Sequence, residues 1–486
     1  MSWEMVIGLE THVELSTRSK IFCTCQTDFG AEPNTHVCPV CMALPGALPV
    51  FNEEVLHRAA MAGYALGCHV HHVSRFDRKN YFYPDLPKAY QISQFYRPIC
   101  EHGQLTVQTA AGERKIGITR IHIEEDAGKL VHDEKQGTML DMNRCGVPLI
   151  EIVSEPDIRS AEEAVGYLRK LRAILTYIGV SDCRMNEGSL RCDVNLSIHK
   201  PGTPFGVRTE MKNLNSFQSV ERAIQAEYER QVAALEAGEE IVQETRRYDQ
   251  KTGKTSSMRR KENSADYRYF PDPDLPEVRL TDSDMAAIRA AIPALPDERR
   301  DAYMQTYGLS AYAAEQLTAE RWLAEYFEAA AAVAASPIAV ANLLQGEVFA
   351  IMSARATDAE KRGDASPEGR ASLPIAPENL AKLADMMAEG RVNSSTGKKI
   401  VAALFRQDQD PQAYAAAHDL FTVGDDSALL DAVRQAIAEN PAMVESYRGG
   451  KLTVEKALMG KAMAITCGKA DPERLAELLH MALASV

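Results

Sequence analysis

The stretch Gly8-Leu-Glu-Thr-His-Val-Glu-Leu15 indicates the fold, because apolar and polar side chains alternate along it. As a strand it would place charged side chains on one face, with the apolar residues and Thr11 on the other. The charged face would carry Glu10, His12 and Glu14. Such a strand suits a sheet that packs against a core on one side and presents polar residues on the other.

The same alternation recurs further along the chain, in Ile116–Glu125, Arg191–Ile198 and Arg208–Lys212. Between these segments, apolar residues follow at helical spacing after Ser160 and Glu163, which form a capping-box pattern, and Gly179 would end this helix. Strands with one charged face and helices packed behind the other predict an α+β fold built on a mixed or antiparallel sheet.

From about Leu280 onward the alternation gives way to helical periodicity. Alanine becomes frequent, and Leu380, Leu383 and Met386 recur at helical spacing. A chain of 486 residues is too long for one core. We therefore expect three domains, covering residues 1–290, 291–405 and 406–486, of which the last two are helical.

The composition is that of an ordinary globular protein, with 45% hydrophobic and 25% charged residues. The net charge of -14 argues against indiscriminate nucleic-acid binding, but it leaves room for a folded RNA on a local basic patch. The alanine-rich run 329–335 is broken by Ser336-Pro337, and the N-terminus lacks the pattern of a signal peptide. These features predict a cytoplasmic protein.

Four cysteines form two close pairs, Cys23-Thr-Cys25 and Cys38-Pro-Val-Cys41. Each pair can direct two thiolates at one ion, and the loop between them can close a tetrahedron. The alternative is four buried reduced thiols, whereas disulfides are disfavoured in the cytoplasm. We expect a structural zinc site with all four ligand positions filled.

Several acids fall where a magnesium site would need them. Glu10 and His12 project from one strand face, Glu124 and Glu125 end a second strand, and Glu151 interrupts the apolar run 147–153. A carboxylate inside such a run needs a metal ion or a basic partner. An ordinary surface acid remains the alternative for Glu124 and Glu125, and an internal ion pair the alternative for Glu151.

Other motifs narrow the chemistry. The sequence has no P-loop, no dinucleotide-binding glycine motif and no nucleophile elbow for amide hydrolysis. The segment Arg75–Lys88 mixes cations with aromatic residues, a combination that suits phosphate contacts and base stacking, or else an exposed loop with its rings tucked inward.

Long ordered segments of the chain resemble the B subunits of tRNA-dependent amidotransferases. They are Glu4–Glu14, Lys79–Gln94, Ile121–Lys129, Asp141–Pro156, Arg208–Asn215, Asp266–Pro276, Gly450–Gly460 and Gly468–Pro472. Together they run through essentially the whole chain. Asn393–Val401 departs from the family pattern, which leaves individual tRNA contacts in the tail unassigned.

The resemblance implies a cradle domain related in fold to glutamine synthetase, a helical domain and a tRNA-binding tail. It implies ATP-dependent phosphorylation of the side-chain carboxylate of Glu-tRNA(Gln) or Asp-tRNA(Asn), followed by amidation. The ammonia would come from glutamine in a partner A subunit, and a small C subunit would complete a heterotrimer.

The resemblance also implies roles for individual residues. Glu10, His12, Glu125 and Glu151 would be catalytic, and Glu10, His12, Glu124 and Glu125 would hold magnesium. Lys79, Arg144 and Arg208 are the candidates for contacts with the phosphates of ATP or with the substrate carboxylate.

Two alternatives remain open. One is a tRNA-binding scaffold subunit whose carboxylates are structural, and the other is a free-standing ATP-dependent ligase for a small acid. The sequence does not distinguish Glu-tRNA(Gln) from Asp-tRNA(Asn) as the substrate.

Overall fold

The computed structural model describes residues 3–133, 137–260, 267–362, 372–422, 426–449, 451, 453–466 and 468–484. Of the family-like segments, Asp266, Gly450 and Leu452 therefore lie outside the described residues. The chain divides into two compact units, Met1–Leu295 and Pro296–Val486.

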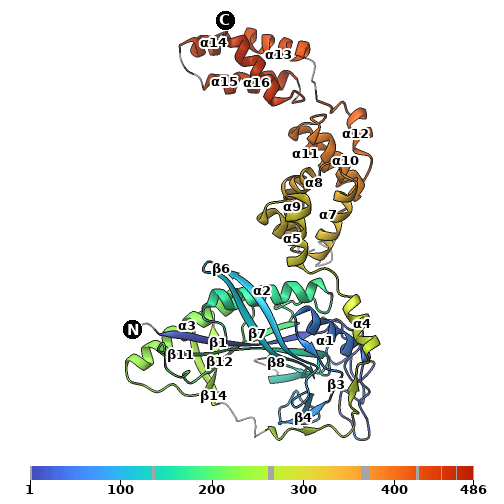
Figure 1. The fold of residues 1–486 in the computed structure, drawn as a ribbon, viewed down its shortest axis with the longest axis vertical. Helices are drawn as coiled ribbons and strands as arrows, with labels where there is room; N and C mark the ends of the chain where they lie inside the picture. Colours follow the sequence, from blue (N-terminus) through green and yellow to red (C-terminus); the bar gives the residue numbers. More distant parts are fainter. Residues whose placement is uncertain are drawn as a thin grey trace. The chain divides into compact units, whose positions relative to one another are not determined.

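The N-terminal unit is built on a nine-stranded sheet in the order β14-β13-β12-β11-β1-β10-β7-β6-β2 (Figure 1). All neighbours are antiparallel except β12 and β13, which run parallel, so the sheet is mixed. In chain order the strands are β1 (Glu4–Glu14), β2 (His69–Val70), β6 (Cys100–Thr109), β7 (Gly112–Glu125), β10 (Pro148–Ser154), β11 (Leu190–His199), β12 (Thr209–Lys212), β13 (Glu244–Asp249) and β14 (Lys254–Arg260).

Within the residues that the structure describes, three small sheets and four α-helices complete this unit. The sheets are β15-β4-β5, β16-β3 and β8-β9. Their strands are β3 (Val73–Ser74), β4 (Asp77–Asn80), β5 (Tyr90–Ser93), β8 (Lys129–Asp133), β9 (Gly137–Asp141), β15 (Phe270–Pro271) and β16 (Val278–Arg279). The helices are α1 (Glu53–Ala65), α2 (Ala161–Tyr177), α3 (Phe217–Glu236) and α4 (Asp282–Ala290).

The two faces of the large sheet differ as the sequence predicts. Leu9, Thr11 and Val13 of β1 are fully buried, whereas Glu10 and His12 are only partly buried on the opposite face. The apolar face packs into one core with α1, α2 and α3, and Figure 1 shows α2 and α3 lying along the sheet. The α+β architecture, with one polar face on the large sheet, is thus confirmed.

The predicted helix after Ser160 is α2, and its start differs from the prediction in one detail. The Ser160 side chain accepts from the Glu163 N–H, as in a capping box, but the Glu163 carboxylate accepts from the Arg159 N–H, one residue earlier. Gly179, with φ of +73°, follows the C-cap.

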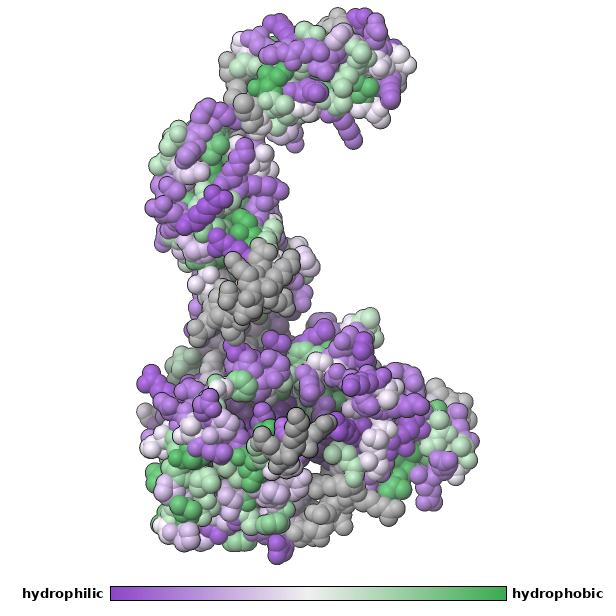
Figure 2. Space-filling model, turned by 180° about the vertical axis from the view of Figure 1, so that it is seen from behind, coloured by the Kyte–Doolittle hydropathy of each residue, from purple (hydrophilic) through white to green (hydrophobic). Residues whose placement is uncertain are grey.

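Every element of the second unit within the described ranges is helical. In chain order they are α5 (Pro296–Tyr307), α6 (Ala311–Leu317), α7 (Arg321–Val333), α8 (Pro337–Leu343), the π-helical turn η2 (Leu344–Val348), α9 (Phe349–Arg362), α10 (Pro377–Ala388), α11 (Ser394–Leu404), α12 (Pro411–Ala417), α13 (Asp426–Glu439), α14 (Pro441–Arg448), α15 (Val454–Ile465) and α16 (Pro472–Ala484). Leu380, Leu383 and Met386 are buried on α10, which confirms the helical period predicted there. Helices α13–α16 enclose an apolar cluster, and the visible outer surface of these helices mixes hydrophilic and smaller hydrophobic areas (Figure 2).

One stretch, Pro337–Arg355, is long and apolar enough to cross a membrane by length and composition alone. The sequence patterns did not indicate that this stretch would meet the criterion for a membrane-spanning helix. Its residues Val340, Leu344 and Val348 are completely buried, and α8 packs against α7 and α10. Core helices of soluble proteins meet the same criterion, so this finding is weak support for a membrane span.

Candidate active site

A row of charged residues crosses the middle of the sheet. The strand register aligns Arg191 of β11, His12 of β1, Glu151 of β10 and His122 of β7 side by side. His12 Nε2 lies 3.5 Å from Glu151 Oε2, and His122 Nε2 lies 3.2 Å from the same oxygen. Antiparallel pairing of alternating strands therefore produces the cluster without any special loop.

Glu124, two residues after His122, joins this cluster. Its carboxylate lies 3.6 Å from both His12 Nε2 and His122 Nε2. One donor atom each from His12, Glu124 and Glu151 lies within 4.8 Å of the others. This spacing suits a single metal ion.

Electrostatics couple the two imidazoles to the two carboxylates. Burial opposes the charged imidazole, but Glu151 and Glu124 outweigh it and raise the pKa of His12 to about 9. Burial likewise opposes ionisation of Glu151, yet His122 and His12 hold its pKa well below the usual range. The carboxylates are therefore ionised and need positive charge beside them, which a divalent cation would also supply.

A second acidic group lies on the same face. Donor atoms of Glu10, Asp193 and Glu210 lie within 4.8 Å of one another. Lys212 Nζ contacts Asp193 and lies 3.6 Å from Glu210. Asn195 donates to Glu10 Oε1 at 2.8 Å.

The two groups offer different donors. Three carboxylates suit magnesium, which prefers oxygen ligands, whereas a histidine nitrogen with two carboxylates also suits other divalent cations. Both sets could hold a divalent ion, which would add positive charge to that of His12, His122 and Lys212 beside the carboxylates. Glu10 belongs to the acidic group and His12 to the histidine group, so the structure divides this predicted pair between two neighbouring groups.

Glu125 lies elsewhere. Adjacent residues of a strand face opposite ways, and Glu125 lies away from Glu124. Its carboxylate accepts from Lys88 Nζ at 2.7 Å and from the Ile92 N–H at 2.8 Å. Both oxygens are thus engaged at the wall of a cavity of about 240 Å³ that Lys88 also lines. Magnesium binding by Glu125 stays a prediction. The structure brings Glu125 into neither the acidic group nor the histidine group.

The three predicted cations lie in different surroundings. Lys79 Nζ lies 5.1 Å from the centre of the Tyr267 ring, and despite burial Glu124 helps to raise its pKa. Arg144 donates to the carbonyls of Ala127 and Gly128, so much of its guanidinium holds a loop. Arg208 is exposed just before β12.

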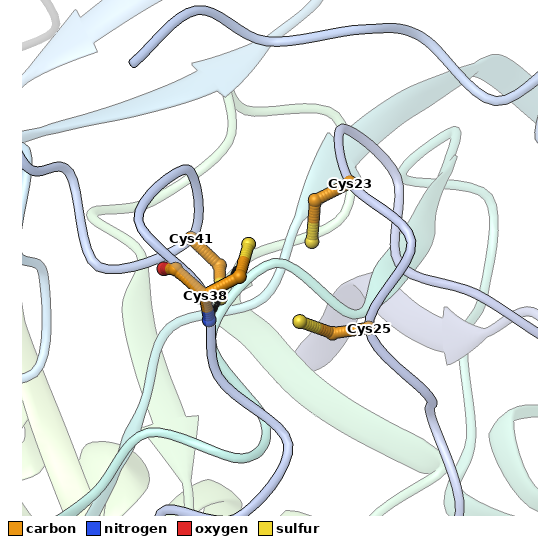
Figure 3. Close-up of side chains that lie close together, drawn as sticks. All are labelled: Cys23, Cys25, Cys38 and Cys41. Atoms are coloured by element: carbon orange, nitrogen blue, oxygen red, sulfur yellow. Dashed lines mark hydrogen bonds between the residues drawn. The ribbon is translucent and has the colours of Figure 1, made fainter. Parts of the chain in front are cut away.

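The four predicted metal-binding cysteines converge, with their sulfur atoms within 4.8 Å of one another (Figure 3). The Cys38 N–H donates to Cys41 Sγ at 3.2 Å, and the Met42 N–H closes the turn onto Cys38 O. A hydrogen bond from Cys23, the Cys38 N–H and the nearby Lys20 together lower the pKa of Cys41 to about 4, against the effect of burial. The cluster could hold a metal ion.

Sequence reasoning missed His122, Asp193 and Glu210 as site residues. The signal was present for His122, which alternates with Glu124 along β7. Asp193 and Glu210 each lay in a recognised alternating segment, but nothing in the linear sequence placed their strands next to Glu10.

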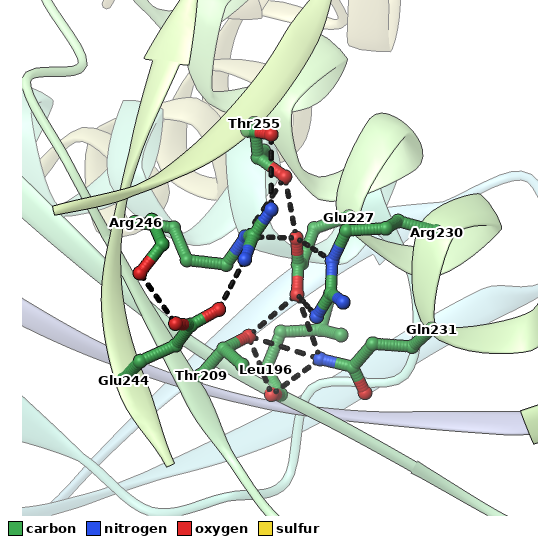
Figure 4. Close-up of polar contacts among 9 residues, drawn as sticks. Leu196, Thr209, Glu227, Arg230, Gln231, Glu244, Arg246 and Thr255 are labelled. Carbon is green, nitrogen blue, oxygen red and sulfur yellow. Dashed lines mark hydrogen bonds and ion pairs between the residues drawn. The ribbon is translucent and has the colours of Figure 1, made fainter. Parts of the chain in front are cut away.

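A buried polar network supports β12 and β13 behind the acidic group (Figure 4). Glu227 of α3 is completely buried, accepts hydrogen bonds from Arg230 and Thr209, and forms an ion pair with Arg246. Thr245 of β13 donates to Glu210 Oε2 at 2.9 Å. The network therefore ties α3 to the two strands that carry and orient Glu210.

Comparisons with known proteins match two successive parts of the chain, one in each compact unit, to described domains. Residues 5–286 match the family described as the GatB/GatE catalytic domain, and residues 325–483 match the GatB domain. The chain is 48% identical to the B subunit of the aspartyl/glutamyl-tRNA(Asn/Gln) amidotransferase from Caldicellulosiruptor saccharolyticus, over 100% of both chains. It is 49% identical to the protein of the same name from Oleidesulfovibrio alaskensis, over 98% of both chains.

Proposed function

The chain belongs to the family of amidotransferase B subunits, and from that premise we propose that it is the ATP-dependent ligase subunit that amidates Glu-tRNA(Gln), Asp-tRNA(Asn) or both. One observation gives the main support for placing this chemistry on the N-terminal sheet. The groups His12–Glu124–Glu151 and Glu10–Asp193–Glu210 share one polar sheet face.

The proposed reaction has two steps. A side-chain carboxylate oxygen of the amino acid on tRNA attacks the γ-phosphorus of ATP, and the bond to ADP breaks. Neutral ammonia then attacks the acyl carbon, phosphate leaves, and the nitrogen loses one proton. Positioning and electrostatics carry most of such a reaction.

In this proposal His12, Glu124 and Glu151 would hold one magnesium ion, and His12 would release its proton when the ion takes over the positive charge beside the two carboxylates. Glu10, with Asp193 and Glu210, would hold a second. When bound, magnesium offsets the negative charge of the phosphate oxygens. Lys79 lies beside Glu124 and Tyr267, where its ammonium would meet a phosphate or the substrate carboxylate. Exposed Arg208 is the next candidate for such a contact, and Arg144 a weaker one because its guanidinium already holds a loop.

The sequence offers no nucleophile elbow for glutamine hydrolysis, and in this proposal the ammonia comes from another subunit. We propose a partner A subunit that releases ammonia from glutamine and a small C subunit in a heterotrimer in the cytoplasm. The Cys23, Cys25, Cys38 and Cys41 cluster would hold structural zinc.

We also propose that the N-terminal unit is a cradle related in fold to glutamine synthetase. The helical region would divide into residues 291–405 and a tRNA-binding tail, residues 406–486. The apolar cluster enclosed by α13–α16 supports a separate C-terminal helical domain.

The test is Glu151→Gln in the complex reconstituted with its partner subunits, mischarged tRNA, ATP and glutamine. Removing this charge should lower ATP-dependent formation of the aminoacyl amide by about 10²-fold or more, with tRNA binding retained. Glu113→Gln, an exposed acid on β7, is the matched control. Unchanged turnover in Glu151→Gln would favour the alternative of a tRNA-binding scaffold without a phosphoryl-transfer site.

A further inference from the structure

Lys20 is a buried cation in an unusual environment. Its side chain is completely buried, which is rare for lysine because removing an ammonium group from water is costly. An ammonium group has three N–H donors. Here Nζ donates to His36 O at 2.7 Å, to Met142 O at 3.3 Å and to Cys41 Sγ at 3.7 Å.

Among the residues that the structure describes, no carboxylate forms an ion pair with the Lys20 ammonium. Two acids, Glu125 and Asp274, line the same cavity as Lys20, but Glu125 pairs with Lys88 and Asp274 pairs with Arg78. The remaining candidate for the counter-charge of Lys20 is the sulfur of Cys41.

We infer that Lys20 is a working part of the four-cysteine metal site, where its ammonium donates to the Cys41 thiolate and offsets part of the cluster's negative charge. This inference rests on the proposed zinc site and assigns to it a residue outside the four ligands. Four thiolates around a divalent ion carry two net negative charges. One hydrogen-bonded ammonium halves that excess, and both residues of this contact, Lys20 and Cys41, are buried.

The position of Lys20 in the chain supports this role. Its backbone N–H donates to Cys25 O at 2.9 Å, while its side chain reaches Cys41, so one residue contacts both cysteine pairs. Through Met142 O it also ties the cluster to the segment that leads into β10. Partners that hydrogen-bond to metal ligands hold their geometry and tune the metal's affinity.

The experiment compares the full-length wild type with Lys20→Met, which has no donors, and Lys20→Gln, which keeps amide donors for the two carbonyls but has no charge. Zinc-loaded proteins are mixed with excess chelator, and the rate of zinc transfer is followed. Both variants should lose zinc about ten to a hundred times faster than the wild type. Lys129→Met removes an exposed lysine and should match the wild type.

A second measurement distinguishes an effect of the Lys20 charge on Cys41 from a purely structural role of the side chain. In cobalt-substituted protein, removing the ammonium raises the electron density on Cys41 sulfur, so the thiolate-to-cobalt charge-transfer band should move to lower energy. Lys20→Gln carries this measurement if Lys20→Met fails to fold. A lysine that only braced the two carbonyls would leave the band in place.

The outcomes keep the two claims apart. If the wild type holds zinc and Lys20→Gln loses it at the same rate, with the charge-transfer band at the same energy, the role of Lys20 alone is overturned. A wild type with reduced cysteines that binds neither zinc nor cobalt through thiolates overturns the metal site itself, and the inference with it.

Discussion

The buried carboxylate of Glu227 offers a sharp test of how the N-terminal unit is held together. It accepts from Arg230 at 2.6 Å, from Thr209 at 2.8 Å and from Thr255 at 2.7 Å, and Arg246 Nε lies 3.1 Å away (Figure 4). Glu227→Gln keeps the volume but removes the charge between two guanidinium groups. Breaking a buried ion pair in this way costs about 3–5 kcal/mol.

The two tryptophans make the assay specific. Trp3 packs on the core of the N-terminal unit, and Trp322 lies in the helical unit. In a Trp322→Phe background, the fluorescence of Trp3 during urea unfolding therefore follows the N-terminal unit alone. Glu221→Gln, an exposed acid on the same helix, is the matched control and should change stability by less than about 0.5 kcal/mol.

The pH dependence has a definite sign. Burial opposes the charge of Glu227, but the hydrogen bonds from Arg230, Gln231 and Thr255 lower its pKa in the folded protein. Its contribution is therefore complete above the unfolded pKa of about 4.3 and is lost as the pH falls through the lower folded value. The difference between wild type and Glu227→Gln should shrink in that range. A loss under about 1 kcal/mol at pH 7, or a difference that grows on acidification, would refute the reasoning.

Three further predictions concern other parts of the chain. Thr245→Val removes the hydroxyl that donates to Glu210 Oε2, and it should raise the magnesium concentration needed for half-maximal activity several-fold. Thr245→Ser keeps the hydroxyl and should behave as wild type. Equal magnesium requirements in the two variants would contradict this. Leu479→Ala opens a cavity in the cluster of α13–α16 and should destabilise those helices by about 2–5 kcal/mol in thermal unfolding, against no change for exposed Met481→Ala. Gly206→Ala should destabilise the N-terminal unit, because a Cβ there would lie 2.2 Å from Ile198 O, and a wild-type melting temperature would speak against the close approach.

The sequence alone determined which faces of the strands are polar. Alternation is a local property, since successive side chains of a strand must point to opposite sides, and so β1 and its charged face were predictable. The cysteine spacing was equally informative, because two cysteines in one tight turn place their sulfur atoms close together. The helical half followed from its periodicity for the same local reason.

Only the tertiary structure decided how these pieces combine. Whether Glu124 or Glu125 faces His12 depends on the register of β7 against β10, which no local pattern specifies. Asp193 and Glu210 reach Glu10 because β11 and β12 come from far along the chain to lie beside β1. Lys20 likewise gained its contact with Cys41 only through folding. Its burial, and the lack of an ion-pairing carboxylate for it among the described residues, are properties of the packed molecule.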